Sequence, residues 1–240
     1  HKCDIAGSKL RHNPSVARPN RRQNALMPSS NVASNLESLR ELPLRRVPRQ
    51  QRSRRRVANM ISAAIDLLVL GGTEAVTTSA VAEKAGVPIG SVYQFFPDRE
   101  TLLLAVAEIS SRPLQETAEL INSDSIPGSD LDSWLVSVLN QLEDQWSKHP
   151  ADVAAWNALV SVPNMDAVTG PIFTNFVNAL AQGVTQHNKS ARLSEKETNE
   201  LCWVLTTSLT AVLSSSLAMK RTSAMAAFKI WATCMFTPHA

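Results

Sequence analysis

The chain has 240 residues, of which 44% are hydrophobic and 19% charged, so it can bury the core of one large domain or two modest ones. It contains no uninterrupted apolar run of about 18 residues and no apolar signal core near its start, so we expect neither a membrane span nor secretion. Cys3, Cys202 and Cys234 are too scattered for a disulfide framework or a metal site, which favours a reducing, cytoplasmic setting.

The formal charge of +3 hides a difference between the two halves of the chain. Residues 1–112 contain 17 Lys and Arg against 9 Asp and Glu, whereas residues 113–240 contain 7 against 12. A basic front half and an acidic back half predict that only the front half meets a polyanion such as a nucleic acid.

Residues 1–48 are rich in Pro, Ser, Asn and Arg without lasting apolar periodicity, so we expect a disordered basic and polar extension. The sequence RRVPRQQRSRRR follows at 45–56, with seven arginines and no acidic residue; it ends in Arg54, Arg55 and Arg56. Such a run is either a solvated charge cluster or an arm that contacts DNA phosphates or the minor groove. The motif that follows it favours the second interpretation.

The first helix is predicted over residues 53–70, where apolar residues recur at helical spacing and Gly71 and Gly72 follow. We expect it to pack under two shorter helices and to hold the angle between them. Its apolar stripe consists of Val57, Met60, Ile61, Ala64, Ile65 and Leu68.

Residues 77–99, TTSAVAEKAGVPIGSVYQFFPDR, are predicted to form two short helices joined by a tight turn. Thr77 or Thr78 caps the first helix, Gly86 suits its left-handed end and Pro88 suits the start of the second. The pattern alone also fits a helical hairpin inside an ordinary all-α core. The arginine run and the charge asymmetry favour a helix-turn-helix that enters DNA. The inward face of the second helix is predicted to be Val92, Phe95 and Phe96.

The rest of the chain is predicted to be helical as well. Asp98 caps a helix that runs to about residue 121, with Pro113 as a kink or break. Ser194 and Glu197 have the spacing of a capping box. No strand pattern appears, so the fold class is all-α, with a DNA-binding domain over residues 49–112 and a helical effector-binding and dimerisation domain over 113–240. Further helices are predicted over 130–148, 151–160, 171–187, about 194–217 and 223–236, with loops at 122–129 and 161–170.

A set of residues between positions 56 and 103 has a recognisable spacing: Ala63-Ala64, Leu67, Gly72, Thr77-Thr78, Val81-Ala82, Ala85-Gly86-Val87, Gly90-Ser91-Val92-Tyr93, Phe96, Arg99-Glu100 and Leu102. On these residues the segment resembles the DNA-binding domain of the tetracycline-repressor (TetR/AcrR) family of bacterial regulators. The resemblance implies a ligand-responsive regulator, most often a repressor, which a small molecule releases from its double-stranded DNA operator. It also implies a homodimer, hence a near-palindromic operator, and a bacterial, nucleoid-associated location.

The resemblance assigns Ser91, Tyr93 and Arg99 to phosphate oxygens, and Thr78 to a similar contact at the start of the bracing helix. For Tyr93 a half-buried core position is the alternative. The recognition helix has no Lys or Arg, and Phe95 stands where the family often has His or Tyr, so attraction to DNA falls on Arg99 and the arginine run. Base contacts are expected from Ile89 and Gln94, with Ser79 as a further candidate and with Gly90 allowing close approach.

The acidic half is expected to dimerise through its last two helices, whose apolar faces need a partner. Its aromatic residues can line a pocket for an apolar or aromatic effector, and for each of them plain core packing is the alternative. No glycine-rich phosphate loop, HExxH or nucleophile motif is present, so we expect no enzyme activity and no cofactor or metal. A helical small-molecule carrier that does not bind DNA would leave the motif and the arginines unexplained. The candidate pocket residues are Trp134, Trp146, Trp156, Met165, Phe173, Phe176 and Trp203.

Overall fold

The computed structural model describes Leu36, Leu39 and residues 42–161, 166–188, 193–219 and 222–236. Every regular element within these ranges is a helix, which confirms the all-α class predicted from the sequence. The α-helices in chain order are α2 (Gln51–Ala75), α3 (Thr78–Lys84), α4 (Ile89–Tyr93), α5 (Arg99–Ser110), α6 (Arg112–Asn122), α7 (Leu131–Lys148), α8 (Pro150–Val160), α9 (Asp166–His187), α10 (Glu195–Met219) and α11 (Thr222–Cys234).

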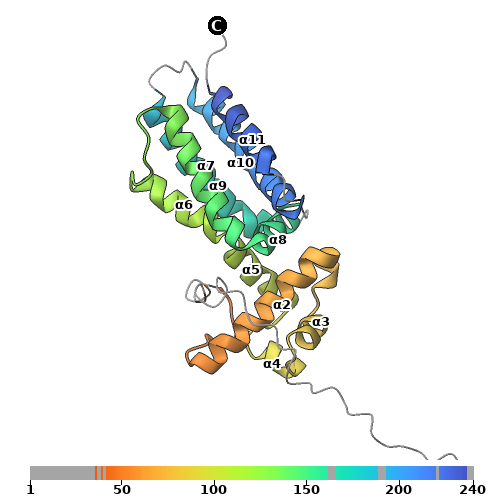
Figure 1. Cartoon of the computed structure of the whole chain (residues 1–240). Coiled ribbons are helices and arrows are strands. Elements are labelled where there is room, and N and C mark those ends of the chain that lie inside the picture. The colour runs from red at the N-terminus through yellow and green to blue at the C-terminus, as the bar shows by residue number, and fades with distance from the viewer. Residues whose placement is uncertain are drawn as a thin grey trace, which may run out of the picture.

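Figure 1 shows these helices in two groups joined by α5. Helices α2, α3 and α4 form one end of the molecule, and α6 to α11 form a bundle that reaches the opposite end. Two hydrophobic cores match the two groups. The first core takes in the apolar faces of α2 to α5, and the second those of α6 to α11.

Helix α2 buries the predicted apolar stripe, which lies against α3, α5 and α8. The backbone of Gly72 has φ 68° and ψ −172°, so the regular helix is interrupted where the sequence predicted its end. Glycine tolerates this left-handed conformation because it has no Cβ. By length and composition alone α2 is apolar enough to cross a membrane. Its apolar stripe is, however, the part that packs in the first core.

Leucines before residue 48 contribute to the first core. Leu36 and Leu39 are buried in it, and Leu42 and Leu44 pack against it. Leu36, Leu39 and Leu42 have the spacing of a helical turn, but so short a run does not predict burial, which depends on a surface offered by distant elements.

Helices α5 and α6 meet at a break rather than forming one continuous helix. Pro113 lies in the first turn of α6, and the N–H of Leu114 donates to the oxygen of Ser111 at 2.9 Å. The Ser110 carbonyl instead accepts from the indole Nε1 of Trp146 at 3.3 Å. A side chain of α7 thus satisfies a carbonyl that the break leaves without its usual backbone donor.

Most of the helices predicted beyond residue 130 are present as α7 to α11. The buried residues of α7 lie on one side at helical spacing and are Leu131, Trp134, Leu135, Val138, Leu139, Leu142 and Trp146. Helix α9 begins at Asp166, so the loop predicted over 161–170 is wrong from residue 166 onward. Pro171 lies inside α9, in its second turn, where it cannot donate a backbone hydrogen bond to the preceding turn. Ser194 and Glu197 form the predicted capping box of α10.

Helix α8 belongs to both cores. Ala155 and Leu159 pack in the first core, whereas Val153 and Trp156 pack in the second. Asn157 adds a hydrogen bond from its amide to the carbonyl of Thr210 in α10 at 2.7 Å. Because α8 contacts α2 and α5 on one side and α10 on the other, it joins the two halves of the molecule.

Candidate nucleic-acid interface and effector core

Local hydrogen bonds fix the two short helices of the motif. Thr77 caps α3, accepting from the N–H of Ala80 at 3.1 Å. Gly86 has φ 65° and ends the turn after α3, as the sequence predicted. Pro88 is the N-cap of α4, and Asp98 caps α5 by accepting from the N–H of Thr101 at 2.7 Å. This backbone hydrogen bond lowers the pKa of the Asp98 carboxyl below its usual value.

The short helix α4 has an inner and an outer face. Val92, Phe95 and Phe96 are buried in the first core, as predicted, so Phe95 packs inside rather than facing a phosphate. Ile89 is 44% exposed and Tyr93 40%, so both side chains face solvent. The outer face also includes the predicted contacts Gly90 and Gln94, which are exposed, and Ser91, which is half-buried.

The phenol of Tyr93 and the hydroxyl of Thr78 lie 3.1 Å apart and form a hydrogen bond. The two residues come from different helices, α4 and α3, so the bond joins the two halves of the motif at its surface. Both were predicted to contact phosphates, and the structure brings them together. Ser79, the next residue of α3, is exposed.

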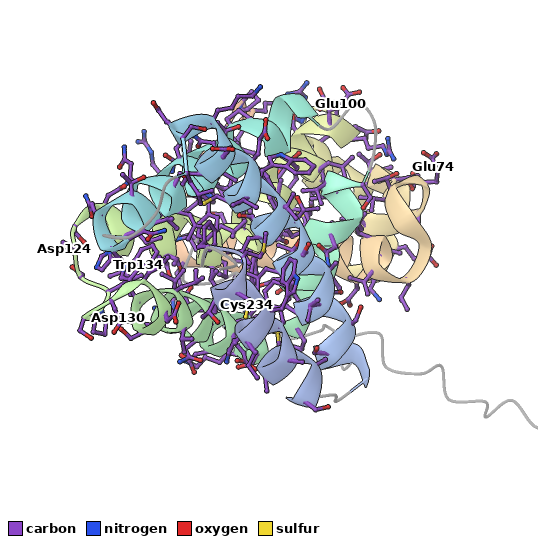
Figure 2. The ribbon with its side chains drawn as sticks, turned by 90° about the horizontal axis from the view of Figure 1, so that it is seen from above. Glu74, Glu100, Asp124, Asp130, Trp134 and Cys234 are labelled. Carbon is purple, nitrogen blue, oxygen red and sulfur yellow. The ribbon has the colours of Figure 1, made fainter. Side chains whose placement is uncertain are left out.

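Arg99 lies differently from the other predicted DNA contacts. Its Nε donates to the carbonyl of Val76 at 2.9 Å, and one terminal nitrogen donates to the carbonyl of Thr73. The same nitrogen lies 3.8 Å from a carboxylate oxygen of Glu74, a residue that Figure 2 shows at the outer edge of the molecule. The guanidinium of Arg99 therefore binds the corner between α2 and α3.

The arginine run divides into a non-helical part and a helical part. Arg54, Arg55 and Arg56 lie in the first turns of α2, with Arg55 exposed and the other two half-buried. Arg45 and Arg49 precede the helix in a non-helical segment and are exposed. The run is therefore partly helical, because α2 begins at Gln51 rather than at the expected residue 53.

The candidate pocket residues do not gather in one place. Trp134, Trp146, Trp156 and Phe176 are buried in the second core. Trp203 is 55% exposed on α10, and its ring meets that of Phe173 edge-on at 6.0 Å. Met165 lies outside the described residues. Close packing in the core accounts for most of this set.

Trp134 shows such packing in detail. Its ring stacks on that of His187 with centroids 4.8 Å apart. A Cβ added to Gly183 would lie 2.1 Å from the indole, so the ring lies directly on the backbone of α9. Figure 2 places Trp134 beside the loop between α6 and α7, near Asp124 and Asp130. Its indole therefore fills the space between α7 and α9.

Two buried tryptophans differ in their polar atoms. The indole N–H of Trp146 donates to Ser110, as described above. Among the described residues, the indole N–H of Trp156 has no hydrogen-bond partner, although the residue is fully buried. Burying a donor without a partner costs about 1–3 kcal/mol, so the burial of this N–H calls for an explanation. Two hydroxyls in nearby helices share this condition, those of Ser110 in α5 and Thr117 in α6.

A groove of about 650 Å³ lies elsewhere, between α9 and the start of α10. None of the predicted aromatic residues lines it. No sequence pattern marks it, because uncharged polar residues on a helix usually face solvent. Its lining consists of Asn178, Ala181, Gln182, Thr185, Gln186, Leu193, Glu195, Thr198 and Asn199.

The outer surface of α10 and α11 carries large apolar side chains. Trp203 and Val204 on α10 are 55% and 42% exposed, and Ile230 and Trp231 on α11 are 68% and 43% exposed. Figure 1 shows the two helices side by side along one flank of the bundle. Cys202, next to Trp203, is by contrast buried, and burial raises the pKa of its thiol to about 12. In the described ranges no three His, Cys, Asp or Glu side chains are grouped so as to hold a metal ion.

An exposed α4 braced by α3 defines a helix-turn-helix DNA-binding protein. Residues 60–106 match the family model described as bacterial regulatory proteins, tetR family. Residues 60–106 therefore form a DNA-binding domain of the tetR type, as the resemblance predicted, and the chain is a DNA-binding transcription regulator. A search of curated proteins gave no match.

Solved structures of bacterial regulators share the fold over most of this chain. FadR from Bacillus subtilis, in complex with stearoyl-CoA, is 14% identical with a TM-score of 0.59, covering 75% of this chain and 98% of its own. A gamma-butyrolactone receptor (ArpA-like protein) is 21% identical with a TM-score of 0.54, covering 78% and 98%. The regulatory protein TetR from Rhodobacter sphaeroides is 16% identical with a TM-score of 0.58, covering 74% and 97%. At these identities the likeness shows the fold alone.

Proposed function

We propose that this regulator is a repressor that binds a near-palindromic DNA operator as a homodimer and is released by a small molecule. It acts in the bacterial cytoplasm, at the nucleoid, and carries out no enzymatic reaction. The observation that carries the proposal is the outer face of α4, where Ile89 and Tyr93 are exposed beside Gly90 and Gln94. In a tetR-family domain such a face has the shape and chemistry to enter the major groove.

Contacts to DNA divide by chemistry into positioning and selecting residues. The hydroxyl pair of Thr78 and Tyr93, with Ser91 beside it, suits phosphate oxygens. Ile89 suits a thymine methyl group and Gln94 an adenine edge. Gly90 lets the backbone of α4 approach the bases, and Ser79 is a further candidate for a base contact.

Dimerisation is supported by the apolar flank of α10 and α11. Trp203, Val204, Ile230 and Trp231 expose more apolar surface than isolated residues of a monomer usually do. A second copy covers this flank in an isologous, four-helix contact. The two α4 helices then lie about one turn of DNA apart, which is why the operator repeats with inverted symmetry.

The effector site is supported by the unpartnered donor of Trp156 in the second core. A ligand that offers a hydrogen-bond acceptor on an apolar body would satisfy this N–H. The solved relatives named above include one in complex with stearoyl-CoA and one called a gamma-butyrolactone receptor. Both molecules carry a carbonyl acceptor on an apolar framework, which fits the same chemistry.

Helix α8 supports a route from effector to DNA. Trp156 lies on α8, one residue after Ala155, which packs in the first core with α2 and α5. A ligand that binds better to one position of α8 shifts the population of dimers in which the two α4 helices fit the operator.

Binding to the DNA that flanks the protein's own gene tests the proposal. We expect a saturable change in fluorescence anisotropy that competitor DNA of unrelated sequence does not remove, and a two-to-one ratio of chains to operator. A protein that binds acyl compounds but gives no specific DNA complex at any salt concentration would instead be a carrier.

Arg99 offers a separate prediction, because its guanidinium donates to Thr73 and Val76. We expect Arg99→Gln to weaken operator binding by about tenfold, the loss expected when charge-assisted hydrogen bonds disappear. The slope of log Kd against log salt should stay unchanged. Arg99→Lys should behave similarly, since an ammonium group cannot reproduce the two-carbonyl contact. If Arg99 bound a phosphate instead, the glutamine variant would lower the slope by about 0.9 and the lysine variant would keep it.

A further inference from the structure

We propose that the non-helical segment over residues 42–50, here named the basic strap, is a fixed second DNA contact beside the recognition helix. Its exposed arginines Arg45, Arg46 and Arg49 bind phosphates that flank the bases read by α4. The inference rests on the proposed function, and it assigns the electrostatic part of DNA binding to a segment outside the tetR-family match at residues 60–106.

The basic strap is attached to the domain at several points. The backbone N–H of Arg45 donates to the carbonyl of Phe95, directly after α4, at 3.0 Å. Leu42 and Leu44 pack against the first core, and Pro48 is buried. The strap therefore passes the carboxyl end of the recognition helix at a fixed place before it enters α2.

The rest of the DNA-binding domain has few cations to offer. Between residues 57 and 110 the sequence contains only Lys84 and Arg99. Lys84 pairs with Asp66 of α2 at 3.2 Å, and Arg99 binds the corner between α2 and α3. Neutralising phosphates with Lys and Arg supplies a large share of the affinity of a protein for DNA, and within residues 42–110 the remaining cations are those of the arginine run.

The position of the strap agrees with this role. Figure 1 shows the start of α2 and α4 at the same end of the molecule, away from the carboxyl terminus. Arg45, which pairs with Phe95 through its backbone, has its side chain exposed at that end, and so does Arg46. Because the strap is already ordered, its arginines bind phosphates without a large loss of conformational entropy.

A triple variant, Arg45→Gln, Arg46→Gln and Arg49→Gln, tests the phosphate contacts. We expect the slope of log Kd against log salt to fall by about 2 to 3, because each phosphate neutralised contributes about 0.9. Operator DNA and unrelated DNA should lose affinity together. The matched control is Arg112→Gln, Lys148→Gln and Lys196→Gln, which removes three positive charges from helices of the second core and should leave the slope unchanged.

A second variant separates a fixed strap from a mobile tail. Leu42→Ser with Leu44→Ser keeps every arginine but removes the packing that holds the strap. We expect operator affinity to fall by about tenfold while the melting temperature of the second core stays the same, because the freed segment must be ordered again when it binds DNA.

The outcomes are distinct from those of the proposed function. If the wild-type chain binds no DNA, the repressor proposal fails. If the wild type binds and the triple variant keeps the full salt slope, the strap is not a phosphate contact and this inference is wrong. If the serine variant binds as tightly as the wild type, the contact does not depend on a fixed strap, and the inference is overturned in that part.

Discussion

Replacing Ile230 and Trp231 with glutamate is expected to convert the protein into a monomer and to weaken operator binding by more than about 100-fold. Full burial of a large apolar side chain contributes about 1.5–3 kcal/mol, and the two residues are the most exposed apolar pair on α11. Each glutamate would also place a charge in the apolar contact. A monomer binds one half-site and loses the gain from binding two linked half-sites.

Light scattering after size exclusion measures the first effect, and fluorescence anisotropy measures the second. Leu70→Glu is the matched control, because Leu70 is 80% exposed and lies on α2, far from the flank of α10 and α11. The control should remain a dimer. A double variant that stays dimeric would show that the apolar flank is not the subunit interface.

The paired changes Trp146→Phe and Trp156→Phe are expected to differ in stability although they remove the same volume. Trp146→Phe takes away the donor to the Ser110 carbonyl and leaves that oxygen buried without a partner. Trp156→Phe removes a donor that has no partner among the residues the structure describes. We therefore expect Trp146→Phe to lower the free energy of unfolding by about 1–3 kcal/mol more than Trp156→Phe.

Chemical denaturation of both variants, followed by circular dichroism, measures this difference. The same pair distinguishes packing from effector binding. Release from the operator by an acyl ligand should be lost in Trp156→Phe, at a protein concentration where Trp146→Phe still responds. Equal losses of stability in the two variants would mean that the Trp156 N–H is satisfied in solution, which would remove the support for an effector contact at this atom.

Features with a local cause could be predicted from the sequence. Asp98 as an N-cap, Ser194 with Glu197 as a capping box, and the left-handed Gly86 each depend on residues within one turn. The apolar side of α7 follows from helical spacing for the same reason. The roles assigned to single residues at the DNA and in the core stay predictions.

Features that depend on distant contacts could not be predicted in the same way. The guanidinium of Arg99 binds carbonyls 23 and 26 positions earlier in the chain, and no spacing rule shows that partnership. The packing of the strap on Phe95 joins residues that are far apart in sequence. Trp134 and Trp156 are the same residue type in different surroundings, since the first stacks on His187 and the second buries an N–H without a partner among the described residues. Counting aromatic residues therefore did not locate a pocket.

Helix α8 also limits how this regulator can be divided. Ala155 and Leu159 complete the core of the DNA-binding half, although they come from the effector half of the chain. A fragment that ends at residue 112 would therefore lack part of its own interior and expose the face of α2 that α8 covers. A chimaeric biosensor that joins this DNA-binding half to another sensor must therefore include α8 together with α2.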